Sequence, residues 1–215
     1  MIGSTDEIKK FLSDNEANVS WRYTGPFDKT KQIVRADNLL HLAARTKNIE
    51  RFLFIFKKSV EKDVSLLEYN DDHKNPFHIA AIMGMLPDVV RGMFEYLQSE
   101  VKSAEASVLE AKEAGRNPRE ELEKLESLRR KVKRKVNSIK DELYDKTSAD
   151  DDGYRPVDWV SDHVERDIRK EVLRAEKSIK AQTYSAGAYE QDEVEIPDHI
   201  LYDVDVNGGE QCKIL

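Results

Sequence analysis

Residue types that carry out catalysis are sparse in this sequence. A nucleophilic-serine elbow, a phosphate-binding glycine loop and a zinc-binding His-Glu-x-x-His helix are all missing. The single cysteine lies four residues from the end of the chain, where no packed pocket is expected. The five histidines are His41, His73, His78, His163 and His199. The sequence therefore predicts a protein that is not an enzyme and that uses no cofactor.

The cysteine begins a four-residue ending that suits lipid attachment. Cys212-Lys213-Ile214-Leu215 matches a prenylation box, and a final leucine specifies a geranylgeranyl group. Lys213 departs from the aliphatic preference at the second position. We predict lipidation at Cys212, with the chance occurrence of a short pattern as the alternative. Because one lipid chain anchors weakly, a second membrane signal would be needed.

Two acidic segments resemble the start of a calcium-binding loop, and both fail as metal sites. Asp203, Asp205 and Asn207 occupy ligand positions, but Ile214 stands where a bidentate glutamate is required. In the second segment, which precedes Gly153, Trp159 stands at that position. Both segments are interpreted as turns, and no metal is expected.

A basic run is the densest positive segment of the chain. On a helix its charges spread over most of the circumference, interrupted by Val132. The favoured interpretation is a solvated face balanced by Glu100, Glu105 and Glu110; the alternatives are a surface for anionic lipid or phosphate and a nuclear-import signal. The candidate anionic-surface residues are Arg129, Arg130, Lys131, Lys133, Arg134 and Lys135.

A seven-residue motif occurs twice. Residues 38–44 (Asn-Leu-Leu-His-Leu-Ala-Ala) and 75–81 (Asn-Pro-Phe-His-Ile-Ala-Ala) share a polar residue, a central histidine and an alanine pair. Each copy is followed by a break and then by apolar residues at helical spacing. This pattern predicts two short antiparallel helices per unit, with the small alanines allowing the first helices of neighbouring units to approach closely.

The motif resembles the ankyrin repeat, whose signature at this point is Thr-Pro-Leu-His-x-Ala-Ala. The resemblance implies that His41 and His78 tie each turn to the neighbouring unit. A more divergent third copy covers residues 152–160 and has Asp158 at the histidine position, which suits a terminal unit. Ankyrin repeats bind partners through their turn tips and first helices, which implies these partner-binding residues here: Arg35, Asp72, His73, Lys74, Tyr154 and Arg155.

The spacing of the copies predicts an insertion. His41 and His78 are 37 residues apart, whereas His78 and Asp158 are 80 apart. The extra residues form two helical patterns, residues 98–114 and 119–143, with Gly115 as a stop signal, Asn117 as an N-cap and Pro118 as the first helical residue. We predict an antiparallel helical hairpin with a coiled-coil-like apolar stripe.

The predicted organisation has five parts. Residues 1–37 form a cap or a degenerate repeat, 38–97 two ankyrin-like repeats, 98–145 the inserted hairpin, 146–182 a terminal repeat, and 183–215 an acidic, largely disordered tail. Low glycine and proline content and 36% charged residues favour long solvated helices, so the fold class is all-α. From Thr183 onward, eight acidic residues and one basic residue account for the whole net charge of −7. A neutral body with an acidic tail argues against nucleic-acid binding.

The sequence predicts an adaptor that binds another protein. Apolar runs are too short to cross a bilayer and no secretory signal is expected, so the predicted location is the cytoplasm, at the cytoplasmic face of a membrane if Cys212 is prenylated. A host-directed bacterial effector, acting in the host cytosol, and a eukaryotic adaptor both fit. The alternative is a structural protein that forms homo-oligomers through its hairpin.

Overall fold

The computed structural model describes residues 10, 19–30 and 32–187. Within these residues the ordered elements are helical, and strand pairing is limited to two isolated β-bridges, which confirms the predicted all-α class. The elements are α2 (Leu39–Arg45), α3 (Ile49–Glu61), α4 (Pro76–Ile82), α5 (Leu86–Glu113), α6 (Arg119–Tyr144), the short 3-10 helices η2 (Lys146–Ser148) and η3 (Pro156–Trp159), and α7 (Asp162–Gly187).

The chain divides into two compact units, residues 1–180 and residues 181–215. The fold described below is that of the first unit. Cys212 and the tail segment that resembles a calcium-binding loop lie outside the described residues.

Each copy of the seven-residue motif forms a seven-residue helix that begins at the same point. Asn38 caps α2 and Asn75 caps α4, and in both helices the motif histidine completes a reciprocal capping box. The turns to α3 and α5 contain Lys47 (φ 52°) and Gly84 (φ 74°), each six residues after its histidine. The two copies therefore share their backbone conformation as well as their sequence.

The third copy is shorter than the first two. Pro156 to Trp159 form a single 3-10 turn, and Val160 is already extended. Val160 and Ser161 stand where the other copies have the alanine pair, and β-branched valine favours extended backbone. The following helix, α7, begins at Asp162.

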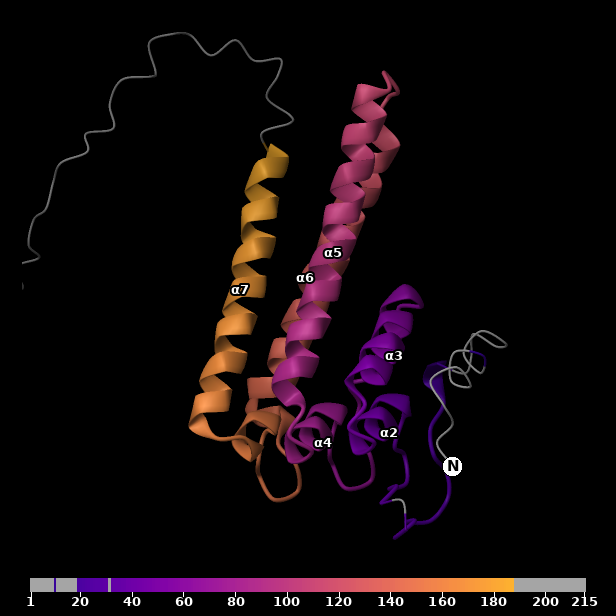
Figure 1. Cartoon of the computed structure of the whole chain (residues 1–215), viewed down its shortest axis with the longest axis vertical. Helices are drawn as coiled ribbons and strands as arrows, with labels where there is room; N and C mark the ends of the chain where they lie inside the picture. The colour runs from indigo at the N-terminus through magenta and orange to yellow at the C-terminus, as the bar shows by residue number, and fades with distance from the viewer. Residues whose placement is uncertain (1–9, 11–18, 31, 188–215) are drawn as a thin grey trace, which may run out of the picture. The chain divides into compact units, whose positions relative to one another are not determined.

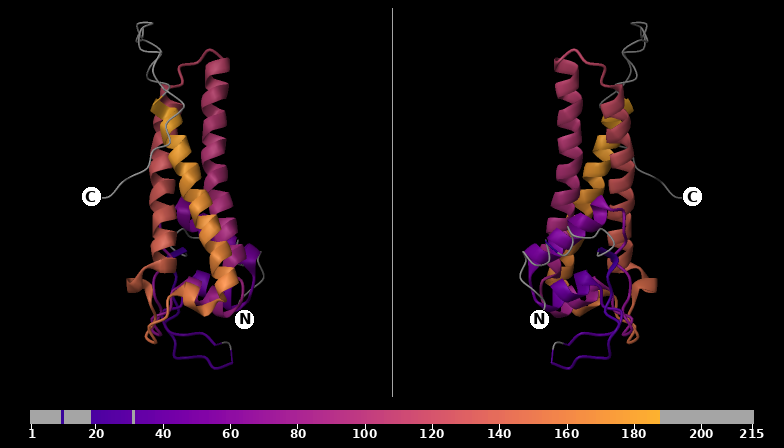
Figure 2. Two further views of the ribbon diagram at one scale, coloured as in Figure 1. Left: turned by 90° about the vertical axis from the view of Figure 1, so that its left-hand side faces the viewer. Right: turned by 90° about the vertical axis from the view of Figure 1, so that its right-hand side faces the viewer.

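Two long helices, α5 and α6, lie side by side in antiparallel directions and extend beyond the short helices (Figures 1 and 2). α5 continues without a break past residue 97, the predicted boundary between the second repeat and the inserted hairpin. Gly115 (φ 66°) follows its end. α6 begins at Arg119, where the predicted helical pattern begins, but Pro118 takes the N-cap position instead of being the first helical residue. The Asn117 side chain, predicted as the N-cap, lies one residue further out and accepts a hydrogen bond from the Arg119 N–H at 3.0 Å.

The hydrophobic core is continuous through the short helices and the long pair. Phe52 and Ile55 of α3, Phe77 of α4, and Ile139 and Leu143 of α6 are fully buried in one cluster. The C-terminal half of α6 is thus part of the core, because Ile139 and Leu143 belong to the same buried cluster as the residues of α3 and α4. The other buried stripe residues of the hairpin include Val101, Val108, Leu125 and Val132.

α7 packs along the long helices (Figures 1 and 2). Its buried residues Ile168, Val172 and Ala175 belong to the same core cluster. An ion pair joins Lys140 to Glu176 at 2.7 Å. The long pair therefore has a third helix of the same chain against it.

The region before α2 contains no helix pair among its described residues. It instead forms two isolated antiparallel bridges, Arg22 with Asn38 at the start of the first motif copy and Asp28 with Ile33. Val19 is buried in the main core, and an ion pair joins Arg22 to Glu68. This segment covers the α2 end of the core without repeating the two-helix pattern.

Candidate functional site

A turn with a left-handed residue at the same position precedes each of the three motif copies. Ala36 (φ 64°), His73 (φ 49°) and Gly153 (φ 83°) all lie in the left-handed region, each five residues before the histidine position. Left-handed backbone is uncommon outside glycine, so its recurrence in one register relates the three turns, and the last two also share their backbone hydrogen bonds.

A polar side chain organises each of the last two turns from within. The Asn70 Oδ1 accepts hydrogen bonds from the N–H groups of Asp72 and Lys74 at 3.1 and 3.0 Å. The Asp150 Oδ1 accepts from the N–H groups of Asp152 and Tyr154 at 3.1 and 3.0 Å. Asparagine and aspartate are interchangeable at this position because the turn requires only one side-chain oxygen that accepts the backbone hydrogen bonds.

The motif histidines connect each copy to the next turn. His41 Nδ1 accepts the Asn38 N–H at 3.2 Å, which leaves its Nε2–H to donate to the Lys74 carbonyl at 2.8 Å. His78 makes the same pair of bonds, to the Asn75 N–H at 3.1 Å and to the Tyr154 carbonyl at 3.0 Å. Burial lowers the pKa of His41 to about 4 and lowers that of His78, so both rings are held neutral.

Asp158 replaces the histidine in the third copy and retains half of its role. Its Oδ2 accepts the Arg155 N–H at 2.8 Å, as histidine Nδ1 does in the other copies. It also binds the Arg155 guanidinium at 2.9 and 2.7 Å, and Arg155 reaches the Tyr144 carbonyl at 3.2 Å. No further copy follows within the described residues, so nothing there takes the hydrogen bond that a histidine Nε2–H would donate.

The turns also contact one another through side chains of opposite hydrogen-bonding character. Asp37, buried and also bound to Arg45, accepts from Asn70 Nδ2 at 2.8 Å. One copy further on the roles are exchanged, because Lys74 Nζ lies 3.3 Å from the Oδ2 of buried Asp150. The residue four positions before the histidine thus always meets the organising residue of the next turn.

These contacts bring most of the predicted partner-binding residues to one edge. The Asp71 N–H donates to the Arg35 carbonyl at 3.0 Å, and His73 Nδ1 lies 2.6 Å from Asp151. We call this row of turns, residues 35, 71–74 and 150–158, the turn edge. Of the predicted residues, Arg35, Asp72, His73 and Tyr154 are exposed. Lys74 and Arg155 are held mainly by contacts within the chain.

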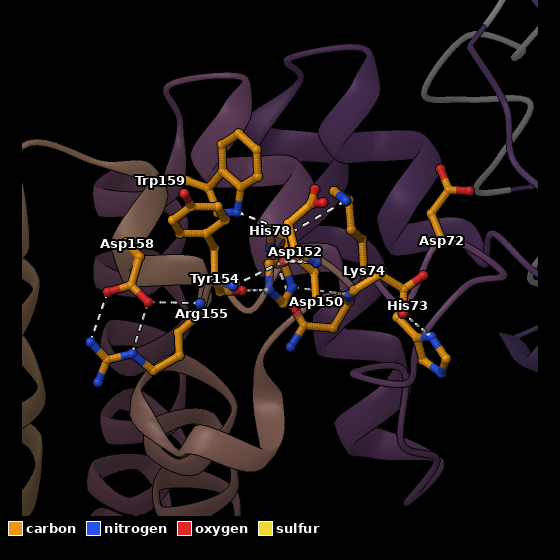
Figure 3. Close-up of polar contacts among 12 residues, drawn as sticks. Asp72, His73, Lys74, His78, Asp150, Asp152, Tyr154, Arg155, Asp158 and Trp159 are labelled. Carbon is orange, nitrogen blue, oxygen red and sulfur yellow. Dashed lines mark hydrogen bonds and ion pairs between the residues drawn. The ribbon is translucent and has the colours of Figure 1, made fainter.

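An exposed aromatic pair stands at the end of the turn edge, and the sequence prediction found only half of it. Tyr154 and Trp159 pack edge to face with centroids 5.6 Å apart, and 52% and 38% of their surfaces remain exposed. The Trp159 indole N–H donates to Asp150 Oδ2 at 3.2 Å, and Lys74 Nζ lies 5.8 Å from the indole ring centre. Figure 3 shows the two rings beside the Lys74 side chain.

A signal for Trp159 was present in the motif. It follows the histidine position, where the first two copies have Leu42 and Ile79, both buried. In a last copy without a successor, the same position has nothing further to pack against. A large aromatic residue there could have been predicted to be exposed.

The basic run does not form one surface. Arg129 binds Glu105 at 2.9 Å, as the balanced-face interpretation expected. Lys131 and Lys135 instead face Asp63, at 3.9 and 3.8 Å, beside a hollow of about 70 Å³ between α3, α5 and α6. Only three members of the run are exposed to solvent: Arg130, Lys133 and Arg134.

The described residues contain no cluster of three or more histidine, cysteine or acidic side chains placed to hold a metal ion. None of the described helices is both long enough and apolar enough to span a bilayer.

Comparison of the chain with protein-family models, with curated proteins and with solved structures found no match. The resemblance to ankyrin repeats therefore rests on the motif residues and on their geometry.

Proposed function

We propose that this chain is a non-catalytic interaction protein built from ankyrin-like units, in which the turn edge and the aromatic pair bind another protein. The observation that carries the proposal is the common register of the three turns. A left-handed residue stands five positions before the histidine position in all three copies, and an organising side chain stands eight positions before it in the last two, which fits a stack of repeats that presents its turns in a row.

The surface chemistry of the turn edge supports binding rather than catalysis. Interface hot spots are enriched in tryptophan, tyrosine and arginine that are held rigidly. Trp159 is fixed by its bond to Asp150, and Tyr154 is fixed against Trp159. Both rings are nonetheless partly exposed, so they offer apolar area that does not have to be ordered when a partner binds.

A photo-crosslinking experiment tests the proposed surface. A benzophenone amino acid is placed at position 154, and a control is placed at Leu173, which is 49% exposed on α7. We expect discrete crosslinked products from position 154 in cell lysate, with competition by excess unlabelled wild-type protein. Equal products from both positions, or none that the wild type competes away, would contradict the proposal.

Membrane attachment through Cys212 is a separate proposal, supported by the sequence of the last four residues. Incubation with a prenyltransferase and labelled geranylgeranyl diphosphate should label the wild type and leave Cys212→Ser unlabelled. Equal labelling of both proteins, or labelling of neither, would remove the proposal. A host-directed effector and a eukaryotic adaptor remain the two settings that would fit it.

A further inference from the structure

We infer that the partner presents a basic peptide segment, with a lysine or arginine packed against Tyr154 and Trp159 and further cations facing the aspartates of the turn edge. This inference rests on the proposed function and specifies the chemistry of the partner. The aromatic pair is exposed at the end of the turn edge.

The protein's own lysine shows what the tryptophan ring accepts. Lys74 Nζ lies 5.8 Å from the Trp159 ring centre, within the range of a cation–π interaction. Lys74 is only 17% exposed and is held by Asp150, so it occupies one side of the pair permanently. The exposed area of Tyr154 and Trp159 offers electron-rich ring surface to a second cation from outside.

The charge of the turn edge favours the same ligand. It contains six aspartates (Asp71, Asp72, Asp150, Asp151, Asp152 and Asp158) against three permanent cations, Arg35, Lys74 and Arg155. All three cations already face carboxylates, at 3.9, 3.3 and 2.7 Å. An acidic partner would therefore have to break these contacts.

Two carboxylates on the turn edge have no such compensation. Asp72 and Asp152 are exposed, and neither meets a basic side chain in the part of the chain that the structure describes. Figure 3 shows Asp72 on the same side of the ribbon as Lys74 and the aromatic rings, whereas Arg155 turns to the opposite side. A basic segment lying along the turns could meet an aromatic pair and free carboxylates together.

The sequence contains a direct optical reporter of this contact. Trp21 and Trp159 are the two tryptophans of the chain, so the Trp21→Phe variant leaves Trp159 as the single emitter. We would titrate this variant with a ten-residue peptide of alternating glycine and arginine. A peptide with citrulline in place of arginine keeps the shape and removes the charge, and a glycine–glutamate peptide tests the opposite charge.

The expected result is a saturable change of Trp159 emission with the arginine peptide alone, weakened at high salt because exposed charges are screened. Tyr154→Ala and the pair Asp72→Asn with Asp152→Asn should each reduce the affinity by roughly tenfold. Leu173→Ala is the matched control and should leave it unchanged. Thermal melting of each variant checks that the fold is retained.

Three results would overturn the inference: no saturable response to the arginine peptide, an equal response to the citrulline peptide, or preferential binding of the glutamate peptide. Failure here is distinguishable from failure of the proposed function. If position 154 crosslinks a partner that wild type competes away, while the arginine peptide does not bind, the surface is correct and its assigned chemistry is wrong.

Discussion

The motif histidines are the residues on which the arrangement of the turns depends most directly. Each accepts a backbone hydrogen bond within its own copy and donates one to the next turn, and both do so while fully buried. A buried ring can make this pair of bonds only when neutral, because a charged imidazole has no acceptor. Their role in the described structure is therefore structural.

This neutrality makes stability depend on pH in a defined window. The pKa of His41 is about 4 in the folded protein and 6.5 in the unfolded chain, so the unfolded chain takes up a proton first as pH falls. The contribution of His41 to the free energy of unfolding is complete above pH 6.5. It is lost progressively towards pH 4, to a total of about 3 kcal/mol. His78 acts in the same direction.

The prediction is checked by urea unfolding at pH 7 and pH 5. Between pH 7 and pH 5, the free energy of unfolding of wild type should fall by about 2 kcal/mol more than that of His41→Gln, because glutamine does not titrate. His163→Gln replaces an exposed histidine and should behave as wild type. If His41→Gln lost as much stability between pH 7 and pH 5 as wild type does, the buried His41 ring would not be the cause of the pH dependence.

At the scale of elements, equivalent contacts between neighbouring turns have their hydrogen-bond donor and acceptor on opposite sides. Asp37 accepts from Asn70, and Lys74 donates to Asp150, although the positions are equivalent. Either assignment satisfies the buried contact, provided that one residue donates and the other accepts. The pairing, rather than either residue, is what the fold requires.

A double-mutant cycle tests this exchange. Asp150→Asn keeps the oxygen that organises its turn but leaves Lys74 facing an amide donor, at a cost of about 2 kcal/mol. Lys74→Asp alone places two carboxylates together and should cost a similar amount. The double variant reproduces the Asp37–Asn70 pair, so chemical denaturation should show at least about 1 kcal/mol of favourable coupling. Strict additivity would refute the equivalence of the two contacts.

At the scale of the whole first unit, the long helices are not free to pair with a second copy over their full length. α7 packs along them, and the C-terminal half of α6 is core. The described part of the hairpin has one large apolar residue that is exposed, Leu109 at 54%. Leu109 is therefore the apolar contact to test for the alternative function, self-association through the hairpin.

Sedimentation over a range of concentrations tests that alternative. We expect the described fold to need no second copy, so Leu109→Glu and the control Leu173→Glu should sediment as wild type does. Self-association that Leu109→Glu abolishes and Leu173→Glu leaves intact would support the oligomerising protein instead of the adaptor.

Local order was predictable from the sequence because its causes act within a few residues. The capping asparagines, the glycine that ends α5 and the apolar spacing of α6 each specify a helix or its end without reference to the rest of the chain. The same holds for the two complete motif copies. For the third copy the prediction was only partly correct, since its first helix is a single 3-10 turn that ends before Val160 and Ser161.

Tertiary structure decided everything that depends on which surfaces meet. Sequence spacing placed six basic residues on one helix, but only the packing of α3 and α5 against α6 sends three of them towards Asp63 and Glu105. Likewise, the motif predicted turns but not the Lys74–Asp150 contact, nor that the same carboxylate binds the Trp159 indole. Such contacts join residues far apart in the chain, so periodicity and capping, which report only neighbours, could not reveal them.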